Sequence, residues 1–176
     1  MDKKTTRRMI KEKRLLYSQE SFLKKSLCIQ KKVLQHQYYQ KASMIGIYVS
    51  LSQEVNTISL IHETLKHHRV CVPRVEGTIM HFYEIHSLDE LKEGHFHVLE
   101  PITNEYVKPE DIDLMIIPML AFDDTNHRVG YGKGYYDQYL VSGFQGYKLG
   151  LAFAFQYVEH IDYDEYDQVL DEILTE

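Results

Sequence analysis

The sequence has no run of apolar residues approaching the ~20 that a membrane-crossing helix needs. Its start, MDKKTTRRMI, is positively charged but lacks the apolar segment of a secretory signal. Its two cysteines, Cys28 and Cys71, do not have the spacing of metal ligands, so we expect both to be free thiols in a reducing compartment. These absences predict a cytoplasmic protein with no membrane partner.

Signatures of covalent catalysis and of metal binding by histidine are also missing. There is no G-x-S-x-G elbow and no Cys/His signature. The pairs His67–His68 and His95/His97 lack a matching third and fourth ligand, so the histidines predict no metal site. No repeat, low-complexity run or linker divides the 176 residues. We therefore expect one domain over residues 1–176, which would bury about two-thirds of its unfolded surface.

Charge is distributed unevenly along the chain. Residues 1–32 carry eleven Lys or Arg against three acidic residues, whereas the rest carries nine basic and twenty-three acidic side chains. The acidic remainder opposes binding along a polyanion, which argues against a nucleic-acid partner. Four cations, Lys3, Arg7, Lys11 and Arg14, share one stripe of a helix expected over residues 3–16. This stripe is either a solvated face or one side of an anion-binding site.

The rest of the chain alternates between short apolar runs and helix-like segments. A second helix is expected after an N-cap at Ser18, with core positions at Phe22, Ser26, Ile29 and Val33 and with Leu23, Leu27 and Leu34 alongside. We expect further helices at 57–68 and 135–141, and strands at 44–50, 69–75, 79–85, 114–119 and 147–153. Residues 88–111 are expected to form a turn-rich connection with one short helical piece at most.

This alternation predicts an α/β fold: a single domain with a mostly parallel central sheet and helices on both faces. Ligands of such sheets bind beyond the carboxyl ends of the strands. The segment RVGYGKGYYD, residues 128–137, follows the most apolar predicted strand and so falls at that edge.

The three glycines of this segment match neither common phosphate motif. The third glycine of a dinucleotide motif falls on Tyr135, and a P-loop would need Ser or Thr where Gly134 stands. Glycines beside Arg128 and Lys133 nevertheless favour a loop whose backbone N–H groups hold an anion. Asp137 would be the third residue of the next helix, where it either complements the helix dipole or binds Mg²⁺.

Four other polar residues have simpler interpretations. Glu54 follows a predicted strand, where it either accepts hydrogen bonds from a ligand or lies in water. Asp123 and Asp124 are interpreted as turn formers, and Arg74 as a surface arginine.

Taken together, the motifs of the chain resemble the 5-formyltetrahydrofolate cyclo-ligase family, also called 5,10-methenyltetrahydrofolate synthetases. The resemblance rests on KKTTR and KEKR near the start, SLSQEVNT, VPRV, LEP, DLMIIPMLAFDDTNHRVGYGKGYYD, GLAFAFQ and LDEILTE. These segments cover nearly the whole chain in the family's order. The resemblance implies a fold akin to the sugar-phosphate isomerase and CoA-transferase group.

The resemblance also implies ligands and the residues that contact them. ATP would be contacted by two segments and one arginine: Lys3, Lys4, Thr5, Thr6, Arg7, Arg14, Arg128, Val129, Gly130, Tyr131, Gly132, Lys133, Gly134, Tyr135 and Tyr136. The folate would be contacted by Val49, Glu54, Tyr131, Gly132, Lys133, Gly134 and Tyr135. Mg²⁺ would be bound by Asp137 and Asp171, and catalysis would depend on Lys3, Arg7, Arg128 and Lys133.

The implied reaction is the ATP- and Mg²⁺-dependent cyclisation of 5-formyltetrahydrofolate to 5,10-methenyltetrahydrofolate, with release of ADP and phosphate. It would proceed through a phosphorylated formyl group, an iminium phosphate. We expect a monomer acting on a small molecule, with or without a polyglutamate tail. The alternative is a non-catalytic module that binds a reduced folate or a nucleotide.

Overall fold

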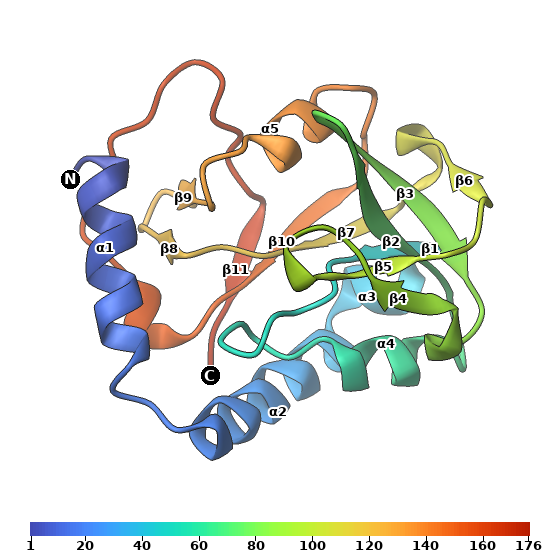
Figure 1. Cartoon of the computed structure of the whole chain (residues 1–176), viewed down its shortest axis with the longest axis horizontal. Helices are drawn as coiled ribbons and strands as arrows, with labels where there is room; N and C mark the ends of the chain where they lie inside the picture. The colour runs from blue at the N-terminus through green and yellow to red at the C-terminus, as the bar shows by residue number, and fades with distance from the viewer.

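The computed structural model describes residues 1–176, and a seven-stranded sheet runs through its middle (Figure 1). From one edge to the other, the strands are β11 (Glu172–Leu174), β10 (Tyr147–Leu151), β7 (Leu114–Ile117), β1 (Met44–Ile47), β2 (Arg69–Glu76), β3 (Ile79–Ile85) and β6 (Tyr106–Val107). The first five strands are parallel, whereas β3 pairs antiparallel with both β2 and β6. The predicted mostly parallel α/β sheet is confirmed.

Strand β7 lies inside the sheet because its sequence is apolar on both faces. Its residues, LMII, are all buried, and it pairs in parallel with β1 on one side and β10 on the other. Continuous apolar runs are typical of parallel strands that are covered on both faces. The predicted strand over 114–119 is therefore confirmed, although it ends two residues earlier, at Ile117.

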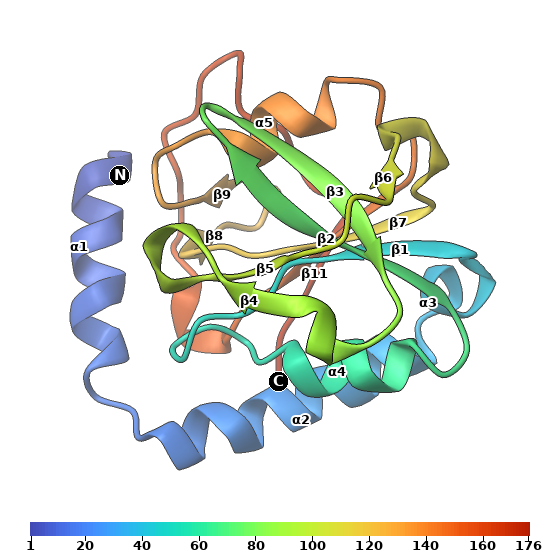
Figure 2. The same cartoon turned by 45° about the vertical axis from the view of Figure 1, so that its right-hand side comes forward.

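Helices cover both faces of the sheet, as predicted. On one face, α2 (Gln19–Gln35), α3 (Gln37–Lys41) and α4 (Ile58–Thr64) pack against alternate strand residues such as Ile45 and Leu114. On the other face, α5 (Tyr135–Leu140) packs with residues such as Met115 and Ile117. Figure 2 shows α2 and α4 on the opposite side of the sheet from α5.

Helix α1 (Lys3–Arg14) stands at the side of the molecule, beside the carboxyl-terminal edge of the sheet (Figures 1 and 2). Its N-cap is Asp2, which accepts hydrogen bonds from the N–H groups of Lys4 and Thr5. Buried Ile10 anchors the helix on the hairpin of β8 (Ala121–Phe122) and β9 (Arg128–Val129). The helix is two residues shorter than the predicted 3–16, and it leaves Leu15 and Leu16 exposed.

The expectation for residues 88–111 was wrong, because this segment contains strands. An antiparallel pair, β4 (Leu91–Glu93) and β5 (Leu99–Pro101), packs beside β2, and β6 joins the main sheet. The 3₁₀ turns of the chain are η1 (Leu88–Glu90), η2 (His95–His97), η3 (Pro109–Asp111) and, further on, η4 (Ala154–Gln156). Strands of two or three residues are too short to show an alternating pattern, so no periodicity predicted them.

Two side-chain interpretations also require correction. Leu23 and Leu27 are exposed on α2, because the helix buries only the face that carries Phe22, Ile29 and Val33. Arg74 is not a free surface arginine. Its guanidinium group stacks on the ring of Tyr83 and donates hydrogen bonds to the carbonyl groups of Pro101 and Thr103.

Arg74 thus holds β5 and the segment after it against β2.

The turn-forming role of Asp123 is confirmed, since its carboxylate accepts hydrogen bonds from the backbone N–H groups of Thr125 and His127.

The close approach of Gly146 to the two residues that precede strand β7 provides a test of this packing. A Cβ atom at Gly146 would lie 2.5 Å from the carbonyl oxygens of Ile112 and Asp113. We therefore expect Gly146→Ala to lower the free energy of unfolding by about 1–3 kcal/mol, measured by urea denaturation. Gly130→Ala is the control, because a Cβ there meets nothing within 4 Å. Equal stability of the two variants would contradict this packing.

Candidate functional site

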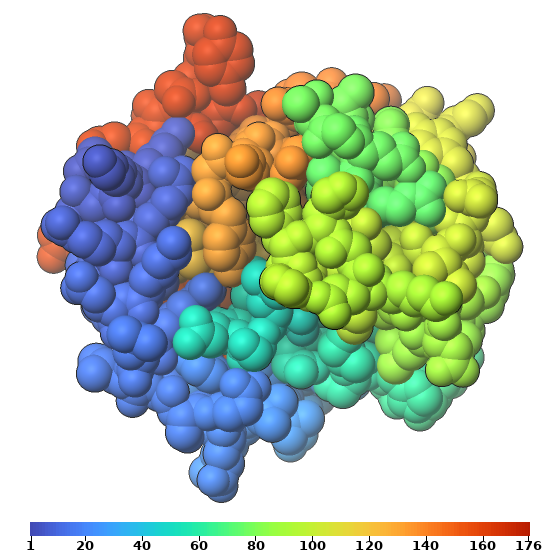
Figure 3. All heavy atoms as spheres, in the orientation of Figure 1, coloured from blue at the N-terminus to red at the C-terminus, as the bar shows by residue number.

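A cavity of about 480 Å³ opens at the carboxyl-terminal edge of the sheet. Tyr48 and Val49, which follow β1, and Pro118, which follows β7, line its base. Figure 3 shows the glycine loop, in orange, between α1, in blue, and the β4–β5 segment, in green. The prediction that residues after β7 lie at a ligand-binding edge of the sheet agrees with this position.

The glycine loop, residues 130–134, presents its backbone to the cavity. None of the N–H groups of Gly130 to Gly134 donates a hydrogen bond to the protein. Gly132 (φ 100°) and Gly134 (φ 70°) have left-handed conformations that favour glycine. Gly134 is the N-cap of α5, so Asp137 is its third residue, as predicted. Five consecutive free amides form a suitable cradle for an anion.

Two cations of α1 reach the cavity from one side. Arg7 Nε donates a 2.8 Å hydrogen bond to the carbonyl oxygen of Gly130. Lys3 Nζ lies 2.5 Å from Asp167 Oδ2 and 3.2 Å from Asp164 Oδ2. Burial by itself would lower the pKa of Lys3, but the hydrogen bonds that it donates to these two carboxylates outweigh this effect and raise that pKa. Lys3 is therefore a fixed positive charge at this side of the cavity.

A buried ion pair lies beneath the loop. Arg128 Nη2 is 3.1 Å from Asp137 Oδ1, and the arginine side chain is only 4% exposed. Its Nε atom has no hydrogen-bond partner. Asp137 Oδ1 also accepts a 3.0 Å hydrogen bond from the N–H of Gln168. The pair fixes a cation and a carboxylate side by side on the cavity wall.

A chain of hydrogen bonds leads from α1 to a buried carboxylate. Arg14 Nη1 donates to the hydroxyl oxygen of Tyr131 at 3.1 Å, and this hydroxyl donates to Glu54 Oε1 at 2.8 Å. Glu54 Oε2 accepts from the N–H of Leu51 at 2.7 Å. Burial raises the pKa of Glu54, while these hydrogen bonds and the charge of Arg14 oppose the rise. Burial, followed by the charge of Glu54, raises the pKa of Tyr131.

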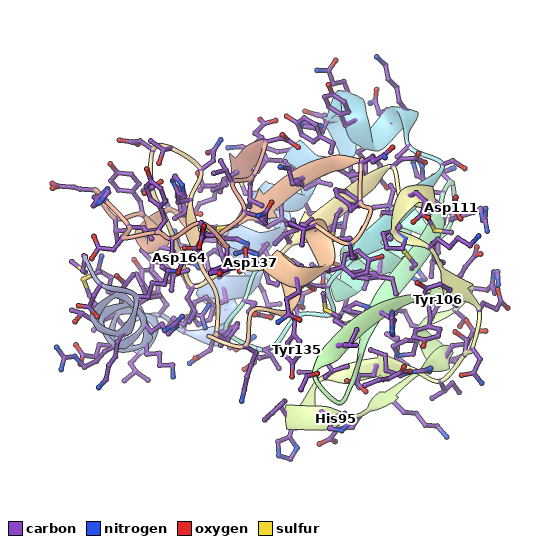
Figure 4. The ribbon with its side chains drawn as sticks, turned by 90° about the horizontal axis from the view of Figure 1, so that it is seen from above. His95, Tyr106, Asp111, Tyr135, Asp137 and Asp164 are labelled. Carbon is purple, nitrogen blue, oxygen red and sulfur yellow. The ribbon has the colours of Figure 1, made fainter.

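The wall opposite α1 is mainly apolar and comes from β2, β3 and the β4–β5 hairpin. The tip of this hairpin carries His95 and Phe96, and the ammonium group of Lys133 lies 5.9 Å from the centre of the Phe96 ring. Seen from above in Figure 4, Asp164, Asp137, Tyr135 and His95 follow one another from the α1 side to the hairpin side. The cavity thus has a charged end and an apolar end.

Most of the residues that the resemblance singles out line this one cavity. They are Lys3, Arg7, Val49, Glu54, every residue from Arg128 to Tyr136, and Asp137. Lys4, Thr5, Thr6 and Arg14 do not line it. Thr6 is fully buried and its hydroxyl donates to the carbonyl oxygen of Asp2, while Arg14 acts through Tyr131.

Asp171 is not brought to the cavity either. It lies at the amino ends of β10 and β11, where its carboxylate accepts a 2.7 Å hydrogen bond from the N–H of Lys148. The geometry therefore separates it from Asp137, which lines the cavity. No group of three or more His, Cys, Asp or Glu side chains is arranged to hold a metal ion.

Sequence reasoning missed about half of the lining, chiefly the apolar wall. The missed residues are Tyr48, Leu51, Pro73, Val75, Met80, His95, Phe96, Val98, Glu100, Pro118 and Asp167. Several of them belong to the β4–β5 segment, for which the sequence predicted no strand. Only Tyr48 and Pro118 carried a usable signal, because each directly follows an apolar strand at the predicted ligand edge.

The structure is that of an α/β protein whose cavity has free loop amides and cations at one end and an apolar wall at the other. The sequence pattern of the 5-formyltetrahydrofolate cyclo-ligase family matches residues 1–176. A mouse 5-formyltetrahydrofolate cyclo-ligase is 32% identical over 189 aligned positions, which cover 99% of this chain and 93% of the mouse protein. No helix of the structure is long and apolar enough to span a membrane.

Two solved structures are similar over nearly the full length. The 5,10-methenyltetrahydrofolate synthetase of Aquifex aeolicus has a TM-score of 0.88 at 33% identity, over 97% of this chain and 88% of that one. The 5,10-methenyltetrahydrofolate synthetase of Mycoplasma pneumoniae has a TM-score of 0.81 at 28% identity, over 99% of both chains. The chain belongs to the 5-formyltetrahydrofolate cyclo-ligase family, which confirms the predicted family and its enzymatic class.

The hydrogen-bond chain through Tyr131 predicts how Glu54 responds to loss of Arg14. Arg14→Met removes a positive charge that favours the Glu54 carboxylate, so the pKa of Glu54 should rise further above its ordinary value. Arg14→Lys should preserve most of the wild-type titration. Carboxyl ¹³C NMR measures this, with the Glu54→Gln protein to assign the resonance.

The pKa of Glu54 also determines how the free energy of unfolding depends on pH. Because the folded-state pKa of Glu54 lies above the unfolded one, the folded protein binds this proton more tightly. Stability from this group therefore increases as the pH falls through the folded pKa, and in Arg14→Met the increase should begin at a higher pH. An unchanged Glu54 titration in Arg14→Met would show that the arginine charge does not act on this carboxyl.

Proposed function

We propose that the protein catalyses the ATP- and Mg²⁺-dependent cyclisation of 5-formyltetrahydrofolate to 5,10-methenyltetrahydrofolate, releasing ADP and phosphate. One observation carries the proposal: the free amides of Gly130–Gly134 and the buried carboxylate of Glu54 share one cavity and are joined through Tyr131. The names of the relatives support the same reaction.

The charged end suits the phosphates of ATP. The loop amides and the side chains of Lys3, Arg7 and Arg128 present positive charge and hydrogen-bond donors to the same space, and Lys133 faces the cavity from the hairpin side. Phosphoryl transfer depends on positioning and charge neutralisation more than on a protein nucleophile, and this end of the cavity supplies both.

Asp137 fits a Mg²⁺ ligand, whereas the position of Asp171 does not. The hydrogen bonds of Asp137 all use Oδ1, which leaves Oδ2 without a protein partner on a side chain that lines the cavity. Mg²⁺ is commonly held by one or two carboxylates together with phosphate oxygens and water. When bound, it would neutralise phosphate charge. A single carboxylate beside a phosphate cradle meets this requirement.

The remaining part of the cavity suits the folate. Glu54 is placed to accept hydrogen bonds from ring N–H groups, beside Val49, and the tyrosines of the loop flank the same space. Its carboxylate is oriented by Tyr131 and the Leu51 N–H before any ligand enters. Preorganised acceptors of this kind fix the orientation of a planar ligand without a further ordering step.

In the proposed reaction, the formyl oxygen of the substrate attacks the γ-phosphorus of ATP, and ADP departs with the electrons of the broken P–O bond. The N10 lone pair then attacks the formyl carbon of the iminium phosphate. The C–O bond breaks, phosphate leaves, and N10 loses its proton, which completes the methenyl bridge. Arg7, Lys133 and Arg128 would stabilise charge on the transferred group, while the loop holds both reactants close together.

We further infer that the protein works as a monomer in the cytoplasm, on a folate with or without a polyglutamate tail. Both cysteines are free thiols, and Cys71 is buried, which is compatible with a reducing compartment.

Direct turnover is the first test. Purified protein with 5-formyltetrahydrofolate, ATP and Mg²⁺ should form the methenyl product, followed by its near-ultraviolet absorbance, with one ADP released per product. Omitting ATP, or replacing it with a non-hydrolysable analogue, should abolish the signal. Folate binding with no consumption of ATP would instead indicate a non-catalytic binding module.

The metal assignment predicts different effects at two aspartates. Asp137→Asn keeps an oxygen to accept the Gln168 N–H, so the protein should remain folded while kcat falls by about 10²-fold or more. Its affinity for Mn²⁺ with nucleotide, measured by electron paramagnetic resonance, should fall as well. Asp171→Asn should retain both properties. Loss of Mn²⁺ affinity in Asp171→Asn, with none in Asp137→Asn, would reverse the assignment.

A further inference from the structure

One carboxylate, Glu100, lies in the apolar wall of the cavity. It belongs to β5 and lines the cavity together with the apolar side chains of Val75, Met80 and Val98. Only 12% of its side chain is exposed. Figure 4 shows the tip of the β4–β5 hairpin, marked by His95, on the side of the cavity away from α1. Glu100 therefore borders the ligand space from the side opposite the phosphate cradle.

The other three carboxylates that line the cavity are compensated within the protein. Asp137 is paired with Arg128, and Asp167 is paired with Lys3. Glu54 accepts two short hydrogen bonds, of 2.7 and 2.8 Å. These three carboxylates thus have strong partners before any ligand enters.

Glu100 lacks such a partner. No Lys or Arg lies within ion-pair distance of it, and His95 Nδ1 is 3.7 Å from its Oε2, too far for a hydrogen bond. Its one hydrogen bond, from the N–H of Val75 to Oε1, is long at 3.4 Å. The carboxylate is seated against Gly94, where a Cβ atom would collide with it. Burying a carboxylate without a cation is unfavourable, so this position favours a ligand that brings positive charge.

The proposed reaction generates such a charge. In the methenyl product one carbon, which carries a single hydrogen, is bonded to N5 and N10, and each nitrogen has two other carbon neighbours. The bridge must therefore contain a double bond, and the two nitrogens share a positive charge. The formyl group of the substrate is neutral. The attraction between the bridge and a nearby carboxylate consequently increases as the reaction proceeds.

The remaining charges of the cavity do not supply this attraction. Lys3, Arg7 and Arg128 surround the space assigned to the phosphates and would repel a cation. Glu54 is assigned to the ring N–H groups of the folate and is already held by Tyr131. The formyl group must lie beside the phosphates to receive one, so the bridge formed from it faces the opposite, apolar wall. The carboxylate in that wall is the remaining candidate.

We propose that Glu100 faces the N5–N10 bridge of the bound folate and stabilises the positive charge that develops there; this rests on the proposed function. The carboxylate is held by the N–H of Val75 and by its seat on Gly94 before the folate binds. A preorganised charge lowers the barrier to ring closure, because it needs no rearrangement as the cation forms. Glu100 is thus a catalytic residue whose interaction with the folate is stronger in the product than in the substrate.

The test compares two ligands that differ only at the bridge. Glu100→Gln removes the charge and keeps an oxygen that can accept the Val75 N–H. The ratio of Kd for freshly dissolved 5,10-methenyltetrahydrofolate to Kd for 5-formyltetrahydrofolate, measured by calorimetry without ATP, should rise at least about 10-fold in this variant. Its kcat should fall by about 10²-fold. Glu93→Gln makes the same charge change in β4 of the same hairpin, outside the cavity, and should leave the ratio and kcat unchanged.

Each other outcome has a defined meaning. An unchanged ratio in Glu100→Gln overturns the proposal. Equal weakening of both ligands overturns it as well, because it would show that Glu100 only holds β5 in place. A ratio that rises as much in Glu93→Gln shows a general effect of charge and also overturns it. If wild-type protein turns over no folate with ATP, the proposed function fails by itself, and the binding ratio, which needs no turnover, still decides the role of Glu100. Failure of both ligands to bind wild-type protein overturns both proposals.

Discussion

The contact between α1 and the glycine loop gives the cavity its form. Arg7 reaches the carbonyl oxygen of Gly130 across 123 positions of sequence, and Arg14 reaches Tyr131 across 117. The N–H groups of the loop donate no hydrogen bond to the protein. The contacts of Arg7 and Arg14, together with the packing of Ile10 against the β8–β9 hairpin, therefore hold the loop in position. The helix therefore contacts two parts of the site: Arg7 bonds to the glycine loop, and Arg14 bonds to the tyrosine that holds the buried carboxylate.

Two cations of the cavity, Arg128 and Lys3, are held by opposite charges, which keeps them in place without a ligand. Arg128 is paired with Asp137 and Lys3 with Asp167, and the backbone N–H of Gln168 binds Asp137. Residues 167 and 168 thus connect both ion pairs through one short segment. In the proposed site, a phosphate would compete with Asp167 for Lys3, which is one-quarter exposed, whereas the more deeply buried Arg128 would keep its orientation. The two cations differ in how freely they can move to a ligand.

The sequence predicted those parts of the fold and site that depend on short-range patterns. The apolar run of β7 and the glycine loop after it identified the ligand edge, and the N-cap at Ser18 located the start of α2. The β4–β5 hairpin was not predictable, because three-residue strands next to polar turns show no periodicity. The role of Arg14 was also hidden, since burial beside Tyr131 follows from how α1 docks and from no local motif.

The failure of the glycine loop to match the known phosphate motifs has a structural reason. In a P-loop the lysine and the hydroxyl that serve the phosphates follow the glycines directly, so one segment supplies the whole site. Here the loop supplies the amides, while α1 contributes Lys3 and Arg7 and β9 contributes Arg128. In the proposed function, this division would leave the far side of the same loop free to contact a second ligand through Tyr131 and Glu54. A loop shared in this way would bring the two reactants together, which is the main requirement for direct phosphoryl transfer between them.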